Sequence, residues 1–188
     1  VRREFFLGGR ERTQSITLNT LILYAVSRVL KSYPLMNAHL LDGETLRTFE
    51  SVNLGFAVDT PRGLYVPKIH NCDRLSLLEI ARTAQLLASR CQDQSITAEE
   101  MTGGTFTVTN LGASGVQYFT PVLNVPETGI LGVGGKIRSS RPGKNGEEFY
   151  DAMGLSVTMD HRAFDGAYGA RFLQELCAAL EDFELLLV

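Results

Sequence analysis

Residues suited to acid–base chemistry gather in the segment Met159–Gly166, which contains His161 and, four residues later, Asp165. An imidazole has an ordinary pKa near ~6.5, so at neutral pH His161 can accept a proton from a weak acid and return it later. Asp165 can pair with an arginine and fix the turn, and Gly166 lets the backbone bend sharply. The same spacing also fits a structural histidine capped by the nearby carboxylate, and spacing alone favours that interpretation.

A second segment, Thr105–Gly112, alternates threonine with apolar residues. This period of two predicts a half-buried strand that ends in a glycine turn. Hydroxyl groups at the end of such a strand can also donate hydrogen bonds to a developing oxyanion. The glycine-rich run Gly129–Gly135 has Ile137 where a dinucleotide-binding loop needs its third glycine, so that function is excluded. We expect these glycines to let a ligand or another stretch of backbone approach a strand closely.

Other patterns argue against whole classes of function. The three histidines lie too far apart in the sequence to indicate a metal site, and the three cysteines lack the C-x-x-C spacing, so we expect no metal and a reducing compartment. The net charge is −3, from 18 basic and 21 acidic residues that are scattered, which argues against nucleic acid as a partner. Every apolar run falls short of the ~20 residues that a membrane helix needs, so no membrane association is expected.

Helices and strands must position these residues. Apolar spacing predicts a helix over Ile16–Tyr33, and capping boxes that begin at Ser76 and Thr97 predict a helix up to Cys91 and a shorter helix. Several predicted strand pairs are joined too tightly to be parallel, so we expect an α/β fold with a mixed sheet covered by helices. The remaining predicted elements are a hairpin of His39–Leu41 and Thr45–Phe49, strands over Val52–Val58, Leu64–Ile69, Thr105–Thr109, Val116–Phe119, Ile130–Ile137 and Phe149–Met159, a turn over Ser139–Gly146 and a helix over Gly166–Phe183.

Five blocks follow one another over nearly the whole chain: Pro34-x-x-Asn37-Ala38, Ala57–Leu64, Gly103–Gly112, Asn124-x-Pro126-Glu127 with Ile130–Gly132, and Asp160–Gly166. Together they resemble one family, the catalytic core of the dihydrolipoamide acyltransferases of 2-oxo acid dehydrogenase complexes, whose fold is shared with chloramphenicol acetyltransferase. The resemblance implies a two-layer sandwich and a single acyltransferase domain over residues 1–188. It also implies transfer of an acyl group between a dihydrolipoyl arm and coenzyme A, with acetyl favoured over succinyl and a branched-chain group left open.

The resemblance also implies a role for individual residues. His161 matches the general base, Thr109 matches the hydroxyl that donates to the oxyanion, and Asp165 matches a residue that orients the histidine loop. The family builds each site between two subunits of a trimer, and trimers assemble into larger shells. Leu185–Val188 resembles the apolar tail that docks into a neighbouring subunit. Contacts with coenzyme A are implied at Arg2, Thr17, Asp59, Asn110 and Gly134.

Because the sequence opens on Val1, we expect it to be an N-terminally truncated piece of a longer protein with lipoyl and peripheral-subunit-binding domains upstream. The implied partners are the 2-oxo acid decarboxylase and dihydrolipoamide dehydrogenase subunits, in the cytosol or the mitochondrial matrix. Two alternatives stay open. The chain could acetylate a small hydroxylated molecule, or it could be a structural core subunit without catalysis.

Overall fold

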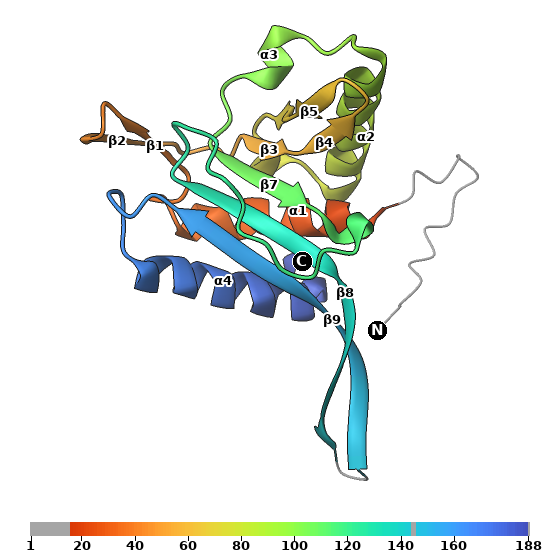
Figure 1. Ribbon diagram of the computed structural model, residues 1–188. Helices are drawn as coiled ribbons and strands as arrows, with labels where there is room; N and C mark the ends of the chain where they lie inside the picture. Colours follow the sequence, from red (N-terminus) through yellow and green to blue (C-terminus); the bar gives the residue numbers. More distant parts are fainter. Residues whose placement is uncertain (1–15, 144–145, 188) are drawn as a thin grey trace.

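The computed structural model describes residues 16–143 and 146–187, and its centre is a mixed five-stranded sheet with the order β6-β3-β7-β8-β9 (Figure 1). The central strand β7 runs parallel to both β3 and β8, whereas β6 and β9 run antiparallel to their neighbours. This mixture of directions confirms the predicted sheet. The strands are β3 (Leu54–Phe56), β6 (Lys68–Ile69), β7 (Phe106–Asn110), β8 (Gly129–Gly143) and β9 (Gly146–Met159).

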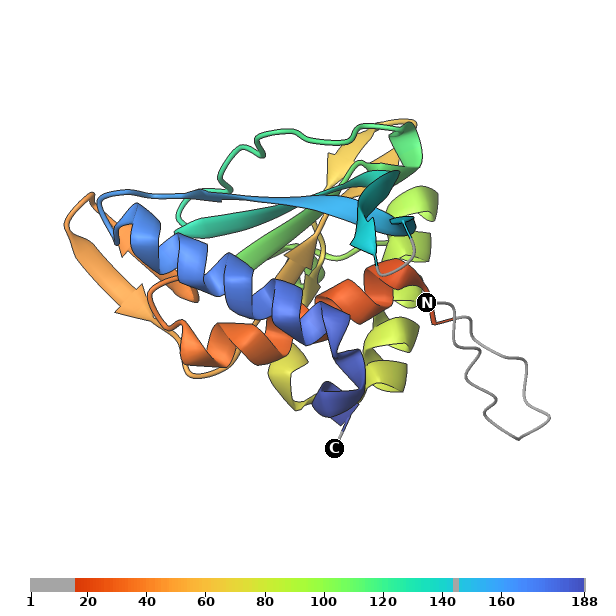
Figure 2. The same cartoon turned by 90° about the horizontal axis from the view of Figure 1, so that it is seen from below.

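Helices α1 (Leu18–Val29) and α4 (Gly166–Glu181) lie side by side on one face of the sheet, as Figures 1 and 2 show together. The apolar residues of β7 alternate onto this face, and the ring of Phe106 packs against that of Phe172 in α4 with centroids 5.8 Å apart. Phe106 and Phe172 are both fully buried. These helices and the sheet form the two layers that the resemblance implied.

The predicted helices begin where their caps place them. Thr17 caps α1, which passes into a 3-10 turn, η1 (Leu30–Ser32), before Pro34. Ser76 and Thr97 form the capping boxes of α2 (Leu77–Asp93) and α3 (Ala98–Met101). Local sequence signals therefore set the starts of α2 and α3 correctly, whereas α1 begins two residues after the predicted Ile16.

The other face of the sheet is covered by chain without regular structure, and here one prediction is wrong. The sequence predicts a strand over Val116–Phe119, but this segment forms no ladder with a strand in the described part of the chain. Ser156 and Thr158 of β9 instead donate side-chain hydrogen bonds of 2.6 Å to the carbonyl oxygens of Phe119 and Pro121. We call residues 116–128 the covering segment.

Before the central strand, one predicted hairpin is confirmed and two predicted strands are each divided into shorter ones. The hairpin β1 (Ala38–Leu41) with β2 (Thr45–Thr48) is confirmed, and Asp42 and Gly43 have positive φ angles of 52° and 74° in its turn. The stretch predicted as strands Val52–Val58 and Leu64–Ile69 is divided further. Its pieces are β3, β4 (Val58–Thr60), β5 (Gly63–Tyr65) and β6, with β4 and β5 forming a hairpin of their own.

Strands β8 and β9 continue beyond the sheet as a two-stranded arm, visible at the bottom of Figure 1. The predicted turn over Ser139–Gly146 is therefore too long, because pairing persists to Gly143 and Gly146. Ion pairs between strands stabilise the exposed arm, including Lys136 with Asp151 at 2.7 Å and Arg141 with Glu148 at 3.1 Å. These cross-strand ion pairs stabilise a long hairpin that the turn-rich composition did not predict.

Candidate active site

His161 lies in the tight turn that joins β9 to α4, and it is exposed in the single chain. Within the described residues its imidazole forms no hydrogen bond. The turn is fixed at both ends, because Asp160 donates its backbone N–H to the carbonyl of Thr128 at 2.9 Å and Phe164 is buried against Tyr168. A rigid turn thus presents an accessible imidazole.

The two carboxylates of this turn have different partners in the structure. Asp165 does not pair with an arginine in the described structure; it caps α4 by accepting the backbone N–H of Tyr168 at 2.9 Å. The arginine partner is Asp160, which binds Arg162 at 2.6 and 2.9 Å. The expected pairing of Asp165 with an arginine is not seen among the described residues, where its carboxylate instead satisfies an unpaired N–H in the first turn of α4. Four arginines, Arg2, Arg3, Arg10 and Arg12, lie outside these residues.

Thr109 is the last of three threonines on the same side of the central strand. Thr105 donates to Asn37, and Thr107 donates to Glu127, both at 2.5 Å. Thr109 is half-buried near the carboxyl end of β7 and forms no side-chain hydrogen bond within the described residues. Of the three hydroxyls, this one is available to another molecule.

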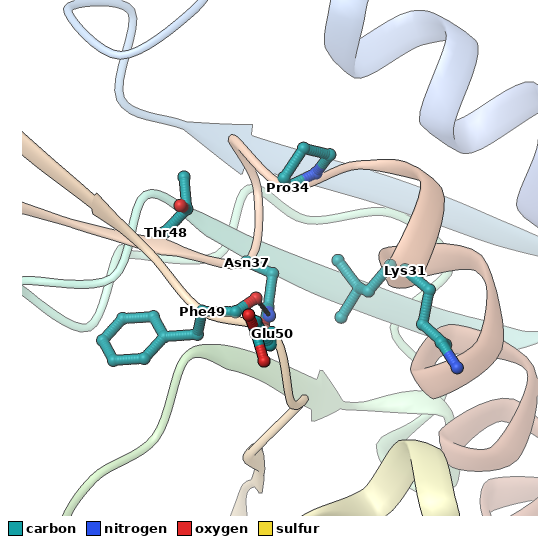
Figure 3. Close-up of a pocket in the computed structure, with 7 residues that line it drawn as sticks. Lys31, Pro34, Asn37, Thr48, Phe49 and Glu50 are labelled. Carbon is teal, nitrogen blue, oxygen red and sulfur yellow. Dashed lines mark hydrogen bonds between the residues drawn. The ribbon is translucent and has the colours of Figure 1, made fainter.

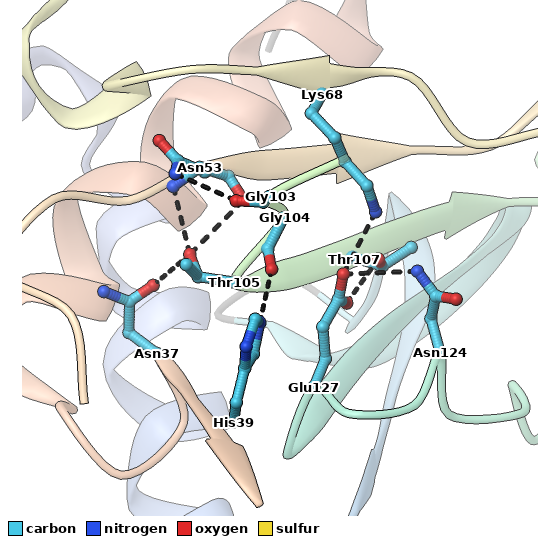
Figure 4. Close-up of polar contacts among 10 residues, drawn as sticks. All are labelled: Asn37, His39, Asn53, Lys68, Gly103, Gly104, Thr105, Thr107, Asn124 and Glu127. Carbon is cyan, nitrogen blue, oxygen red and sulfur yellow. Dashed lines mark hydrogen bonds and ion pairs between the residues drawn. The ribbon is translucent and has the colours of Figure 1, made fainter. Parts of the chain in front are cut away.

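A buried ion pair that the sequence analysis did not identify lies beside Thr107, two residues before Thr109. Lys68 and Glu127 are 3.0 Å apart, and their side chains are only 4% and 3% exposed. Thr107 and Asn124 also donate to the Glu127 carboxylate, so three donors converge on it (Figure 4). The only sequence signal was the Asn124-x-Pro126-Glu127 block, because Lys68 is distant in sequence. This network ties β6, β7 and the covering segment together.

Within one chain the structure does not bring Thr109 and His161 together. Thr109 pairs with Gly132, whereas Met159, two residues before His161, pairs with Gly129 at the other end of the ladder. Three residues of strand separate these levels by about 10 Å, before the distance across two strands is added. A hydroxyl and an imidazole at opposite ends of a sheet can meet only if they come from different chains.

The residues expected to contact coenzyme A lie mostly at the Thr109 end of the sheet. Asn110 binds Asn19 at 3.1 Å in the first turn of α1, which Thr17 caps. Asp59 follows the parallel strand β3 and is exposed, as are Thr17 and Asn110. Arg2 lies outside the described residues. The described polar side chains therefore gather at one exposed edge.

The structure of the single chain explains why residue 134 is a glycine. It is buried, and a Cβ added to it would lie 1.9 Å from the carbonyl oxygen of Gln117 in the covering segment. The expectation that a glycine here permits close approach of another backbone is confirmed.

A cavity of about 400 Å³ lies between the end of α1 and the end of β2 (Figure 3). The seven predicted site residues that the structure describes are not among its lining residues. The side-chain amide of Asn37, which lies in its wall, already donates to the carbonyls of Phe49 and Ser51. The cavity is lined by Leu30, Lys31, Pro34, Asn37, Thr48, Phe49 and Glu50.

Over residues 16–143 and 146–187, no group of three or more His, Cys, Asp or Glu residues is placed to hold a metal ion. Cys72, Cys91 and Cys177 are unpaired thiols. No helix in the described part of the chain combines the length and apolar character needed to cross a membrane.

Comparison with solved structures defines the class of fold. The chain superposes on chloramphenicol acetyltransferase with a TM-score of 0.55 at 13% identity, covering 87% of this chain and 78% of that one, so the two share an architecture. It superposes more closely on the cubic core of the pyruvate dehydrogenase multienzyme complex, with a TM-score of 0.83 and 39% identity over 93% of this chain and 72% of that one.

The family follows from the sequence. The model of the 2-oxoacid dehydrogenases acyltransferase (catalytic domain) matches residues 2–188, so the chain belongs to this family. A dihydrolipoyllysine-residue acetyltransferase component of the pyruvate dehydrogenase complex from Acholeplasma laidlawii is 42% identical over 92% of this chain and 32% of its own length. The acetyltransferase component of the acetoin cleaving system of Bacillus subtilis is 40% identical over 89% and 42%. The chain thus spans about a third to two fifths of the length of these relatives.

Proposed function

We propose that this chain is the catalytic core of a dihydrolipoamide acyltransferase, which transfers an acetyl group between a dihydrolipoyl arm and coenzyme A. The observation that carries the proposal is the pair of unused groups, the Thr109 hydroxyl and the His161 imidazole, which lie at opposite ends of one sheet. Relatives from two complexes, the pyruvate dehydrogenase complex and the acetoin cleaving system, are named acetyltransferases, which supports acetyl as the transferred group.

A solved relative supports the three catalytic positions. A crystallographic and enzymatic study of Azotobacter vinelandii dihydrolipoamide acetyltransferase concerns a serine, a histidine and an asparagine in its catalytic mechanism. In that protein the histidine follows the serine by 52 residues and the asparagine follows the histidine by four. Thr109, His161 and Asp165 have the same separations. Threonine keeps the hydroxyl of serine, and aspartate keeps an oxygen that accepts the helix-capping hydrogen bond.

The reaction needs a thiolate and a place for negative charge. A thiol with a pKa near ~8.5 is only a few per cent ionised at pH 7, so a base beside it accelerates attack by typically ~10²–10⁴. His161 takes the proton of the coenzyme A thiol, and the sulfur attacks the carbonyl carbon of the acetyl thioester on the lipoyl arm. Thr109 donates a hydrogen bond to the resulting oxyanion, which is worth on the order of 3 kcal/mol. Collapse breaks the bond to the lipoyl sulfur, which receives the proton from His161.

Each active site then requires two chains, and we infer a homotrimer in which Thr109 of one subunit faces His161 of the next. The cubic core of a pyruvate dehydrogenase complex, a structural relative, supports assembly into a larger shell. The C-terminal turn η4 (Phe183–Leu187) suits a contact between trimers. Tyr24 holds it to the domain through the carbonyl of Leu186 at 2.9 Å, while Leu185 stays 75% exposed.

Coenzyme A would enter at the edge formed by Thr17, Asp59 and Asn110. A lipoyl domain outside this chain would supply the dihydrolipoyl arm, and the decarboxylase and dihydrolipoamide dehydrogenase subunits would load and reoxidise it. The compartment would be the cytosol or the mitochondrial matrix.

Complementation between two inactive chains tests the proposal. His161→Ala and Thr109→Ala each lower acetyl transfer from acetyl-coenzyme A to dihydrolipoamide by about a hundredfold or more. When the two chains are co-expressed in equal amounts, random trimers restore both groups at about a quarter of the sites, so activity returns to about a quarter of the unmodified level. Sites built within one chain would leave the mixture as inactive as its parts.

A matched mixture controls for assembly. Unmodified chain co-expressed with the double variant also yields about a quarter of full activity when sites are shared, but about half when each chain has its own site. Full activity of His161→Ala would refute the proposed chemistry. Transfer to chloramphenicol instead of dihydrolipoamide would favour the alternative acceptor.

A further inference from the structure

The residues on either side of His161 bind each other. Arg162 donates from Nε to Oδ1 of Asp160 at 2.9 Å and from Nη2 to Oδ2 at 2.6 Å. The backbone N–H of Arg162 also donates to Oδ1 at 3.0 Å. A bidentate guanidinium–carboxylate pair is geometrically strict. It therefore fixes the backbone both before and after the imidazole.

The pair is anchored to the core on one side only. The Asp160 side chain is 17% exposed, and its backbone carbonyl accepts the N–H of Ala163 at 2.9 Å. Its N–H binds the carbonyl of Thr128, which is fully buried. Arg162, in contrast, is 66% exposed. An exposed pair of this kind adds little to folding stability, so stability does not explain its geometry.

The pair also sets the charge beside His161. The Arg162 guanidinium lowers the pKa of Asp160, so at neutral pH the residues directly before and after His161 in the sequence carry one negative and one positive charge, which largely cancel. Other charged groups on the surrounding elements include Asp165 at the end of the turn, Arg171 of α4 over the Tyr168 ring, and Asp42 and Glu44 on the β1–β2 turn. That hairpin comes close, because a Cβ on Gly43 would lie 3.4 Å from Nη1 of Arg162.

We propose that Asp160 and Arg162 are positioning residues for acyl transfer: they hold His161 in its reactive orientation and balance each other's charge beside its ring. The inference rests on the proposed role of His161 as general base. Loss of the bidentate geometry misplaces the base, and a misplacement of about 1 Å can cost up to ~10² in rate. Loss of one charge changes the pH at which the imidazole becomes protonated.

Three variants separate geometry from charge. Arg162→Lys keeps the positive charge but cannot form two parallel bonds, so kcat falls about tenfold while KM changes less than about twofold and the pH profile stays in place. Arg162→Gln leaves the Asp160 carboxylate unbalanced, which favours the protonated imidazole and moves the acid limb of the kcat profile up by about half a pH unit. Asp160→Asn leaves Arg162 unbalanced and moves that limb down by a similar amount.

Each variant is measured as the assembled protein, by native mass, thermal midpoint and the pH dependence of acetyl transfer. Arg141→Gln is the matched control, because it breaks an exposed arginine–carboxylate pair on the arm that extends beyond the sheet. We expect it to leave activity unchanged. Opposite displacements of the acid limb, together with the loss of kcat in Arg162→Lys, support the proposal, since a merely structural pair would not produce them.

Assembled variants with unchanged kcat and unmoved limbs overturn it. If Arg162→Gln fails to assemble, Arg162→Lys and Asp160→Asn decide the question by the same readouts. His161→Ala is measured beside them to distinguish two failures. When His161→Ala is inactive and the pair variants behave as wild type, only the positioning role is lost; when His161→Ala is active, the proposed function fails first.

Discussion

Removing both partners of the buried Lys68–Glu127 pair destabilises the protein less than the two single removals would together. Glu127 receives hydrogen bonds from three donors on separate parts of the fold, and both charged side chains are almost completely buried. Glu127→Gln keeps the shape but leaves the Lys68 ammonium without its counter-ion. Breaking a buried pair in this way costs about 3–5 kcal/mol of the free energy of unfolding.

The reverse substitution, Lys68→Met, leaves the carboxylate with neutral donors only, and its cost falls in the same range of about 3–5 kcal/mol. Methionine is apolar and flexible, and it occupies the space that Gly55 and Gly104 leave for the lysine stem, where a Cβ would lie 2.7 and 2.6 Å from Lys68. The double variant removes both charges, so we expect it to cost at least about 2 kcal/mol less than the sum of the single variants.

Urea denaturation at a fixed protein concentration measures these differences, because assembly makes the apparent stability depend on concentration. Lys136→Met is the matched control: its partner is Asp151 on the exposed arm, and we expect a change within about 0.5 kcal/mol. Single variants that cost less than about 1 kcal/mol, or a double variant that equals the sum of the singles, would refute the reasoning.

Three further predictions concern the packing of Gly134, the helix cap at Asp165 and the buried thiol of Cys72. Gly134→Ala forces the carbonyl of Gln117 aside and lowers stability by about 1–3 kcal/mol in the same assay; an unchanged midpoint would show that the covering segment yields freely. Asp165→Ala removes the cap that accepts the N–H of Tyr168 and costs about 1 kcal/mol, whereas Asp165→Asn retains most of it, so equal losses would contradict a capping role. Burial raises the pKa of Cys72 to about 12, so at pH 8 an alkylating reagent leaves this thiol unmodified in the folded protein, and peptide mass spectrometry showing rapid labelling would be the contrary result.

Helix starts and the β1–β2 hairpin were predictable from sequence because their determinants are local. Ser76 and Thr97 each have the acidic residue three positions later that completes a capping box, and Asp42-Gly43 can adopt positive φ. The strand predicted over Val116–Phe119 was wrong because its pattern is that of a strand, whereas pairing depends on neighbours that are distant in the sequence.

The residues of the candidate site also divide into those that local motifs indicate and those that only the fold brings together. Motifs pointed to His161, Thr109 and Asp165, but spacing did not indicate that Asp160 would bind Arg162 while Asp165 caps α4, because it does not reveal which acceptor the first turn of a helix will use. Lys68 was missed altogether, since its partner Glu127 lies 59 residues later and only the fold brings the two together.

The covering segment is attached to the sheet quite differently from a strand. In the described residues, Val116 accepts the N–H of Gly135, and two side chains of β9 bind carbonyls further along, but no backbone N–H from Val116 to Asn124 finds a backbone acceptor. The hydrogens of such amides exchange with solvent through local openings of small free energy, whereas those of β7 and β8 exchange only on global unfolding. Hydrogen exchange would therefore show this face of the sheet as a fast-exchanging layer over a slowly exchanging ladder.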